Sequence, residues 1–388
     1  MRTAFVPFPT LLAGFVAVLV GYASSAAIIW QAAAAAGASA LQISGWMTAL
    51  GLAMGVSTLL LTLWRKVPIL TAWSTPGAAL LVGGLQGATL NDAVGIFIFA
   101  NGLIVLCGLT GWFARLMKLI PHSLAAAMLA GILLRFGLQA FGTLEGHLLL
   151  CGSMLAGWLL FKALAPRYAV VAALAVGVVV AALKGDVVTN SLALIFVTPQ
   201  FIAPHFSLTQ LLSIGVPFFL VTMASQNAPG LATLQASGYA VPVSPLIVIT
   251  GALGLLLAPF GVYSVCIAAI TAAICQSPDA HPEPHKRWLA AAAAGVFYLL
   301  AGIFGGSITA LMAALPAVWI QMLAGLALLG TLGGSLFQAL ASAHERDAAM
   351  VTFLVTASGI TLAGVGSAFW GLIVGGVSFA LLSRKTTA

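Results

Sequence analysis

The chain has 388 residues, of which 62% are hydrophobic and only 5% carry a charged side chain. A water-soluble surface needs several times more charge, so the composition excludes a soluble globular protein and indicates a polytopic membrane protein. The formal net charge of +7 could suit an anionic partner such as nucleic acid, but the positions of the cations point to membrane orientation instead.

About fourteen apolar elements follow one another along the chain, because a membrane span needs about 20 predominantly apolar residues and some of these elements are shorter. We expect an all-α fold with elements at 10–34, 41–63, 68–86, 91–111, 122–141, 148–164, 168–183, 209–231, 244–258, 260–275, 287–305, 315–340, 349–364 and 367–383.

The basic residues indicate the orientation of these elements. With a cytoplasmic N-terminus, only Lys184 of the cations at element ends falls outside. Cytoplasmic loops are enriched in Lys and Arg, so we expect both termini in the cytoplasm. The cations at cytoplasmic ends are Arg2, Arg65, Lys66, Arg115, Lys118, Lys162, Arg167, Lys286, Arg287, Arg346, Arg384 and Lys385.

The N-terminal segment superficially resembles a cleavable signal peptide, with Arg2, an apolar run and small residues at 23–26. We favour a retained first span, because its removal would leave an odd number of elements. It would also discard polar residues that the second half of the chain repeats.

Two apolar elements are interrupted at matching places. One break is Trp73-Ser74-Thr75-Pro76-Gly77, and the other runs from Pro259 through Phe260 and Tyr263 to Ser264. Each break is expected to begin a half-helix, with Ser74 or Thr75 as the cap of the first, Pro76 at its first helical position and Ser264 as the cap of the second. The alternative is a proline kink in each of two continuous spans.

Short segments recur in the same order at an offset of about 190–203 positions. Ala23-Ser24 recurs as Ala224-Ser225, and Met128–Gly131 recurs as Met322–Gly325. Seven elements in the first half would place the second half inverted in the membrane. The N-terminal ends of the two half-helices would then face each other near the midplane, where their unpaired amides suit an anion.

Further candidate residues lie beside the breaks. Gln226-Asn227 precedes Pro229-Gly230, and the corresponding place in the first half carries Tyr22, Ser24 and Ser25. The amides could donate to a carboxylate or join neighbouring helices. The rings of Trp73, Phe260 and Tyr263 could hold an aromatic group or serve as ordinary packing.

These motifs resemble a known family, the benzoate transporters, along essentially the whole chain. The resemblance is carried by 9–15, 21–26, 71–77, 223–230 and 260–264. It implies benzoate–proton symport in the bacterial inner membrane and a fold similar to uracil-permease-type transporters, with a core domain, a gate domain and often a homodimer. By that analogy the repeats are 1–184 and 209–388 with an extracytoplasmic linker at 185–208. The core is 10–111 plus 209–305, and the gate is 122–183 plus 315–383.

The chain departs from the nucleobase permeases at one place. Those proteins carry acidic residues in the eighth and tenth spans, where this chain has Gln226, Asn227, Tyr263 and Ser264. All seven acidic residues fall in loops or at span ends. A site without negative charge favours an anionic substrate, because no like charge opposes a desolvated carboxylate. A proton would have to come with the substrate or through a histidine, and every histidine falls in a loop or at a span end.

Arg135 is the one basic residue well inside an expected span, about 20 Å along its helix. An intramembrane charge is a functional candidate by default, here for substrate contact or the gate. The alternative is a structural role in which the side chain snorkels outward and pairs with Glu145.

The sequence therefore predicts a secondary active transporter of a small aromatic carboxylate, benzoate above all, coupled to protons and working by alternating access. Alternatives are an exchanger or uniporter for another small organic anion, or a nucleobase-like transporter. We expect no enzyme activity, cofactor or metal site, since the chain shows no set of nucleophile, acid–base groups or metal ligands. The segment His281-Pro-Glu-Pro-His285 imitates a metal-ligand spacing, but its two prolines prevent a regular helix. The expected partners are the carboxylate, protons and membrane lipids.

Overall fold

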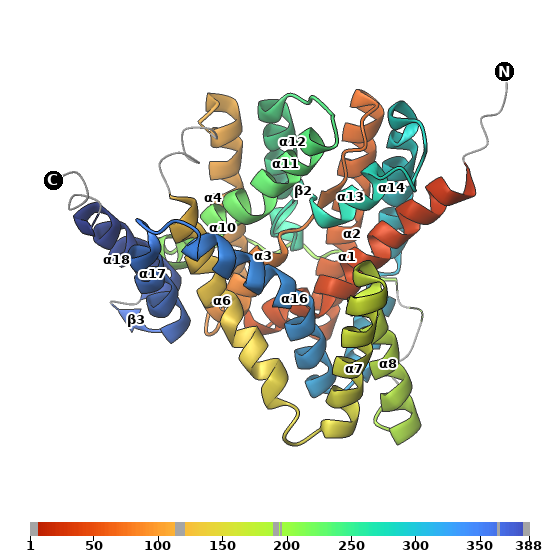
Figure 1. Ribbon diagram of the computed structural model, residues 1–388, viewed down its shortest axis with the longest axis horizontal. Coiled ribbons are helices and arrows are strands. Elements are labelled where there is room, and N and C mark those ends of the chain that lie inside the picture. Colours follow the sequence, from red (N-terminus) through yellow and green to blue (C-terminus); the bar gives the residue numbers. More distant parts are fainter. Residues whose placement is uncertain (1–6, 113–120, 189–193, 195, 363–364, 383–388) are drawn as a thin grey trace.

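The fold was obtained as a computed structural model that describes residues 7–112, 121–188, 194, 196–362 and 365–382 (Figure 1). Five of the cations used to orient the chain lie outside these described residues, namely Arg2, Arg115, Lys118, Arg384 and Lys385. The described part is mostly helical, with two short two-stranded pairings, β1–β2 and β3–β4.

The first half of the chain contains long helices and one interrupted element. Its elements are α1 (Phe8–Ala35), α2 (Ala40–Arg65), β1 (Thr71–Ala72), α3 (Thr75–Gly84), α4 (Leu90–Thr110), α6 (His122–Gly142), α7 (Leu148–Leu164), the 3₁₀ turn η1 (Pro166–Tyr168) and α8 (Ala169–Lys184).

The second half is more irregular at its start. It contains α9 (Leu208–Gln210), the π-helical η3 (Leu211–Gly215), α10 (Val216–Thr222), the π-helical η4 (Met223–Asn227), α11 (Ala228–Ala236), α12 (Val243–Leu257), the 3₁₀ turn η5 (Ala258–Phe260), β2 (Cys266–Ile267), α13 (Ile270–Gln276), the 3₁₀ turn η6 (Pro284–Lys286), α14 (Trp288–Ile303), α15 (Gly305–Ala314), α16 (Ala317–Leu340), α17 (Arg346–Ser358), β3 (Thr361–Leu362), β4 (Val365–Gly366) and α18 (Ser367–Leu382).

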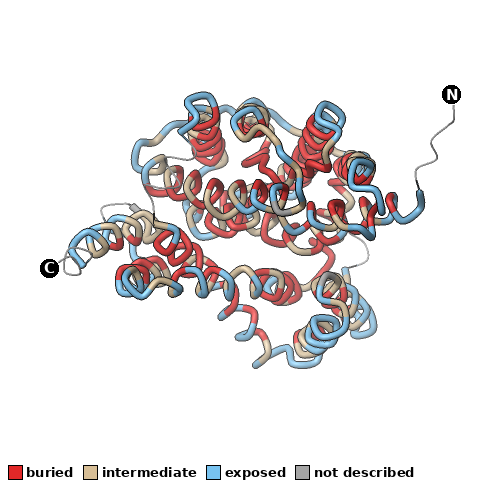
Figure 2. The backbone as a smooth tube through the Cα atoms, turned by 45° about the horizontal axis from the view of Figure 1, so that its top comes forward, coloured by how far each residue is buried: buried red, intermediate tan, exposed pale blue. Residues whose placement is uncertain are grey.

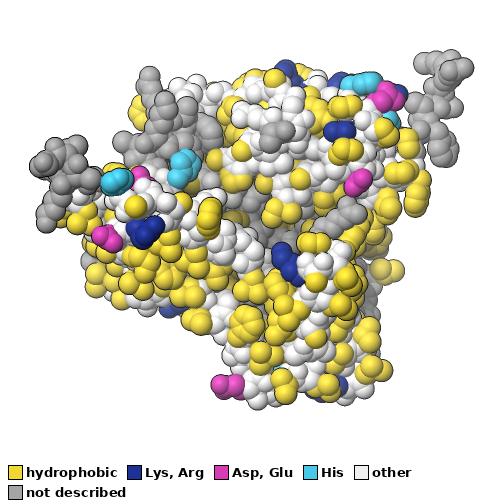
Figure 3. Space-filling model, in the orientation of Figure 1, with side chains coloured by type: hydrophobic (Ala, Val, Ile, Leu, Met, Phe, Trp, Pro, Cys, Tyr) yellow, Lys and Arg dark blue, Asp and Glu magenta, His cyan; other side chains and the backbone are white. Residues whose placement is uncertain are grey.

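Helical segments of the described chain are long and apolar enough to cross a membrane in eight places, and four shorter apolar helices accompany them. Hydrophobic side chains cover much of the surface, and few charged ones interrupt them (Figure 3). The protein is therefore a polytopic membrane protein, as the composition predicts.

The expected span at 260–275 is wrong over most of its length. Residues 261–269 form turn and extended chain, and α13 begins only at Ile270. The short helix α15 lies where no element was expected, between the expected spans 287–305 and 315–340. The expected span at 209–231 is a helical run that two π-helical segments interrupt.

The helices pack mainly in two groups. In one group α2 packs on α14, α4 on α12, and α1 on α14 and α3; in the other α6 packs on α16 and α17, α17 on α18, and α7 on α8. Figure 1 shows α17 and α18 below and to the left of the first group, and α7 and α8 below its right-hand part. Most helices bury one side within the molecule and expose the other (Figure 2).

Small residues allow the closest helix contacts, as is usual where lipid gives helices no hydrophobic reason to associate. Gly51 on α2 faces Gly302 on α14 so closely that a methyl group on either would overlap the backbone of the other helix. The α2–α14 pair therefore depends on these two glycines.

Candidate functional site

The two interrupted elements meet as a pair of antiparallel strands in the centre of the molecule. Thr71 of β1 lies opposite Ile267 of β2, and Ala72 lies opposite Cys266. The Ala268 N–H donates to the Leu70 carbonyl at 2.9 Å, which extends the same register. These strand residues are almost all buried, since backbone groups away from water must pair with other protein groups.

The first half-helix begins as the sequence predicts. Ser74 is the N-cap of α3, and its hydroxyl accepts a hydrogen bond of 3.0 Å from the Gly77 N–H. Thr75 occupies the first helical position and Pro76 the second, one residue later than expected. Pro76 fits there because an N–H at this position would have no helical partner.

The expectation that Ser264 caps the second half-helix is wrong. The N-cap of α13 is Ala269, which forms no side-chain cap hydrogen bond. The Ser264 hydroxyl instead accepts a hydrogen bond of 2.9 Å from the Ser74 N–H. Ser264 therefore supports the beginning of α3 from across the strand pair.

The register also separates the two helix ends. α3 begins just beyond Ser74, beside Ser264, whereas α13 begins two residues beyond Ala268, which pairs with Leu70. Each half-helix thus begins at the end of the strand pair away from the other. The strand pair therefore separates the two N-terminal ends, and the expectation that they face each other near the midplane of the membrane stays a prediction.

The amides at the start of α3 are largely used within the protein. The Ser74 N–H donates to Ser264, and the N–H groups of Gly77 and Ala78 donate to the hydroxyl and carbonyl oxygens of Ser74. Pro76 has no N–H. The Thr75 N–H is the only first-turn donor that these bonds do not use, so this helix end offers an anion less than a bare N-terminus would.

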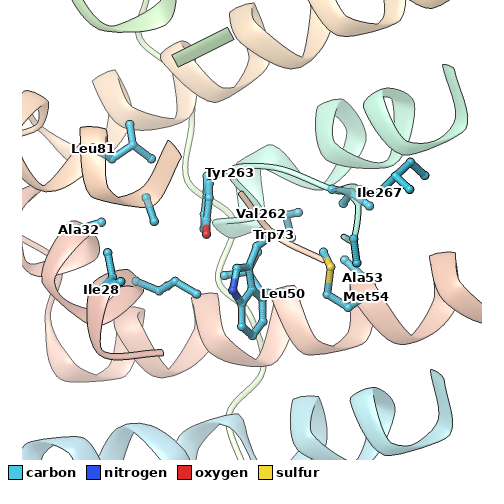
Figure 4. Packing of buried hydrophobic residues seen from close by; sticks show 14 of the residues in the cluster. Ile28, Ala32, Leu50, Ala53, Met54, Trp73, Leu81, Val262, Tyr263 and Ile267 are labelled. Carbon is cyan, nitrogen blue, oxygen red and sulfur yellow. The ribbon is translucent and has the colours of Figure 1, made fainter. Parts of the chain in front are cut away.

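An aromatic cluster of Tyr22, Trp73 and Tyr298 lies beside the strand pair. Figure 4 shows Trp73 and Tyr263 among the buried side chains of this region. The ring of Trp73 meets Tyr22 edge-on with centroids 4.9 Å apart, and Tyr298 of α14 lies 6.1 Å from Tyr22 and 6.3 Å from Trp73. Trp73 Nε1 donates to the Ser25 hydroxyl at 2.6 Å. Tyr298 was not predicted as a site residue, because nothing in its local sequence distinguishes it from other aromatic residues of apolar spans.

The hydroxyl of Tyr22 is buried without a hydrogen-bond partner among the described residues. The nearby Ser24 hydroxyl donates to the Gly21 carbonyl at 3.0 Å, so Ser24 is bonded within its own helix. An unpaired buried hydroxyl costs free energy unless a ligand satisfies it. Tyr22 is therefore a stronger candidate for ligand contact than Ser24.

Gln226 and Asn227 bind the second strand. Asn227 Oδ1 accepts a hydrogen bond of 3.0 Å from the Ile267 N–H, and Gln226 Nε2 lies 3.4 Å from the Ile267 carbonyl oxygen as its donor. Both residues belong to the π-helical η4, a form often found at functional sites. The two amides hold β2 in place, while Gln226 stays half-buried.

Phe260 lies apart from the other predicted site residues. Its ring meets Phe201 edge-on at 5.9 Å, and the neighbouring Pro259 carbonyl accepts from the Ile202 N–H at 2.8 Å. These contacts place Phe260 against the segment that precedes α9. Tyr263 does lie at the strand pair, with its hydroxyl donating to the Ser74 carbonyl at 3.3 Å.

Asn101 of α4 was not predicted, although it holds the second break. Its Nδ2 donates to the Tyr263 carbonyl at 2.9 Å and to the Phe97 carbonyl at 2.8 Å, and its side chain is fully buried. A lone asparagine within an apolar span is the signal that could have identified it.

A cavity of about 530 Å³ lies between the two helix groups. Its walls come from α3 and the turn after it, from α6, from η3, and from the β3–β4 turn with the adjoining ends of α17 and α18. It reaches Ala79, one turn beyond the start of α3, and its lining includes Arg135. In the orientation expected from the charges, the ends of α3 and α6 that line this cavity lie on the extracytoplasmic side of the membrane.

The acidic residues lie away from the strand pair, as expected. Asp92 sits in the first turn of α4, where its carboxylate accepts from the Thr89 N–H at 2.9 Å and lies 2.6 Å from His205 Nδ1. Glu283 lies in an exposed loop, where a hydrogen bond from Lys286 at 2.7 Å lowers the pKa of its carboxyl. Within the described chain no group of three or more His, Cys, Asp or Glu residues could hold a metal ion.

Two broken elements pair inside a bundle of membrane-spanning helices, and a cavity lies beside them. These are features of a membrane transporter. The chain belongs to the benzoate membrane transport protein family, whose sequence model matches residues 4–381. It is thus a multi-pass inner-membrane transporter and not an enzyme.

Two relatives show this membership in detail. The chain is 70% identical to Inner membrane protein YdcO of Escherichia coli K12, over 99% of this chain and 98% of that one. It is 39% identical to the Benzoate membrane transport protein of Acinetobacter baylyi, over 96% of this chain and 95% of that one.

Solved structures share the fold at low sequence identity. The murine anion transporter Slc26a9 in its inward-facing state superposes with a TM-score of 0.60 at 14% identity, covering 100% of this chain and 70% of that one. The transmembrane domain of the cyanobacterial bicarbonate transporter BicA gives a TM-score of 0.61 at 15% identity, covering 95% and 97%.

Proposed function

We propose that the protein is a secondary active transporter of a small aromatic carboxylate, most simply benzoate. The observation that carries the proposal is the combination of family membership with a central site built from aromatic rings, hydroxyls and amides. The relative from Acinetobacter baylyi is named for benzoate transport. The solved structures of the same fold are named for anion and bicarbonate transport.

The proposed substrate site lies beside the strand pair. The rings of Tyr22 and Trp73 would contact the aromatic ring of the substrate, and the Tyr22 hydroxyl and Thr75 N–H would donate to its carboxylate. Other predicted site residues have polar atoms that are bonded within the protein, and they would hold the substrate-contacting groups in position. These residues are Ser25, Ser74, Tyr263, Ser264 and Asn227.

In this proposal the chain consists of two inverted repeats, 1–184 and 209–388. Parts of both repeats form a core of 10–111 plus 209–305 and a gate of 122–183 plus 315–383. The two groups in which most helices pack support this division. The cavity lies where core elements α3 and η3 face gate elements α6 and α18. Alternating access would close this cavity and open another on the cytoplasmic side as the core moves against the gate.

Proton coupling is part of the proposal, although the central site holds no carboxylate that could carry the proton. A benzoate that enters with its own proton would satisfy the coupling without a protein group. The competing hypotheses are a uniporter or exchanger of organic anions, and a nucleobase-like transporter.

The test is uptake of labelled benzoate by proteoliposomes, with protein-free liposomes as the control for passive entry of benzoic acid. We expect protein-dependent uptake that an inward-directed proton gradient accelerates at constant benzoate anion concentration. Uptake that ignores the gradient would remove proton coupling and leave a uniporter or exchanger. Protein-dependent uptake of uracil without uptake of benzoate would overturn the proposed substrate.

A further inference from the structure

Among the described residues that line the cavity between the two helix groups, Arg135 alone has a charged side chain. The other polar residues of the lining are neutral, for example Gln86, Gln139, Gln210 and Thr356. The volume of about 530 Å³ falls in the range typical of small-molecule sites. A cation in an otherwise neutral wall favours a negatively charged ligand.

Arg135 has no carboxylate partner in the described part of the chain. The alternative pair with Glu145 does not form, although the structure describes both residues. The guanidinium instead lies against the backbone of Gly359, the residue that ends α17 in the left-handed conformation with φ of 68°. A side chain at that position would overlap the guanidinium, so the glycine leaves Arg135 room on the cavity wall.

A structural role at the end of α17 accounts for only part of this arrangement. The positive charge of Arg135 is favourable near the C-terminal carbonyls of α17. This interaction leaves most of the guanidinium N–H donors free, because an arginine has five of them. They form a fork whose geometry matches a carboxylate. Gln139 lies one helical turn further along α6, on the same wall.

Other polar groups around the cavity do not neutralise Arg135. Asp92 is engaged with Thr89 and His205. The hydroxyl of Thr356, which lies in the lining, has no hydrogen-bond partner among the described residues. That hydroxyl oxygen is buried against Gly371 of α18, so the unpaired group that the wall offers to a ligand is the Arg135 guanidinium.

We propose that Arg135, with Gln139, forms a second anion site that binds the carboxylate of the substrate before it reaches the strand pair. The inference rests on the proposed function, because it assumes that a small organic carboxylate enters from this cavity. Arg135 would form the charged hydrogen bonds, and the apolar wall of α3 would receive the ring. From there the cavity leads to Ala79, about 6 Å along α3 from Thr75.

The test replaces Arg135 by a cysteine whose charge can then be chosen. The native cysteines at 107, 151, 266 and 275 are all buried, which keeps background labelling low. We expect Arg135→Cys to raise the external benzoate concentration for half-maximal uptake about tenfold or more, the effect of losing a charge-assisted hydrogen bond. Modification with a positively charged trimethylammonium thiosulfonate should restore most of the loss, and the negatively charged sulfonate reagent should not.

Lys162→Cys is the matched control, because it removes an exposed cation of α7 that does not line the cavity. It should leave half-maximal uptake unchanged with either reagent. Equal behaviour of the two variants, or rescue of Arg135→Cys by both reagents, would overturn the inference.

A second variant keeps the inference testable if Arg135→Cys does not fold. Gln139→Cys retains Arg135, and we expect benzoate to slow its modification by the sulfonate reagent severalfold. Modification at the same rate with and without benzoate would overturn the outer site. If the unmodified protein neither binds nor transports benzoate, the proposed function itself fails, and that outcome is read from the wild-type protein alone.

Discussion

The backbone N–H of Ser74 donates a hydrogen bond to the hydroxyl of Ser264 at 2.9 Å, although 190 residues separate the two in sequence. Both side chains are fully buried. The bond joins the two broken elements at the point where α3 begins, so the second break holds the first helix end in place.

Replacing Ser264 by alanine should destabilise the protein by about 1–3 kcal/mol, because the buried Ser74 N–H loses its acceptor. The measurement is thermal unfolding in detergent. Ser378→Ala is the control, since Ser378 is a half-exposed serine bonded within its own helix, and it should change stability by less than about 0.5 kcal/mol. Equal stabilities of the two variants would contradict the role given to Ser264.

Asn101→Ala should be at least as damaging, at about 1–3 kcal/mol, because it leaves the buried Tyr263 carbonyl without its donor and opens a small cavity. Benzoate affinity should also fall, since Tyr263 lies at the proposed site. Asn91→Ala, at the exposed start of the same helix, provides the comparison. If Asn101→Ala unfolded at the wild-type temperature, Asn101 would not be a support of the second break.

The sequence indicated the start of α3 because the signals there are local: a serine cap, a proline within the first turn and an apolar helix after them. The second break was misread for a reason that is also physical. Residues 261–269 are rich in Val, Tyr and Ile, which suit a strand as well as a helix. Their extended conformation depends on pairing with Thr71 and Ala72, a partner that local sequence does not reveal.

The same distinction separates the site residues that were found from those that were missed. Trp73, Ser74 and Asn227 lie in or beside proline-marked segments. Asn101 and Tyr298 lie in regular helices and reach the site only through packing. The cavity at Arg135 likewise depends on how α6 faces α3 and α17, which only the folded structure defines.

Tyr22→Phe separates folding from binding. The Tyr22 hydroxyl is buried without a described partner, so its removal should leave the unfolding temperature unchanged or raise it. If the hydroxyl donates to the carboxylate, the Kd for benzoate should rise about five- to tenfold. Ser25→Ala should show the opposite pattern of a clear loss of stability, because it breaks the bond from Trp73 Nε1. A Tyr22→Phe variant with wild-type affinity would remove Tyr22 from the site.

Gly302→Ala should disrupt the contact between α2 and α14. A methyl group there overlaps the backbone at Gly51 and Leu52, and such overpacking costs about 1–3 kcal/mol. Gly333→Ala is matched to it, since Gly333 also lies within a helix but has no atom near the position of a new methyl group. Thermal unfolding should show a loss for Gly302→Ala and no loss for Gly333→Ala, and the reverse order would contradict the packing.

The central claim, that the protein recognises a carboxylate attached to an aromatic ring, is tested most directly by calorimetric titration of the purified protein with benzoate and with benzamide. The two ligands have nearly the same shape, but only benzoate is charged. We predict saturable binding of benzoate and at least tenfold weaker binding of benzamide, which corresponds to about 1.4 kcal/mol. Equal binding of the two ligands, or no binding of benzoate, would contradict the account.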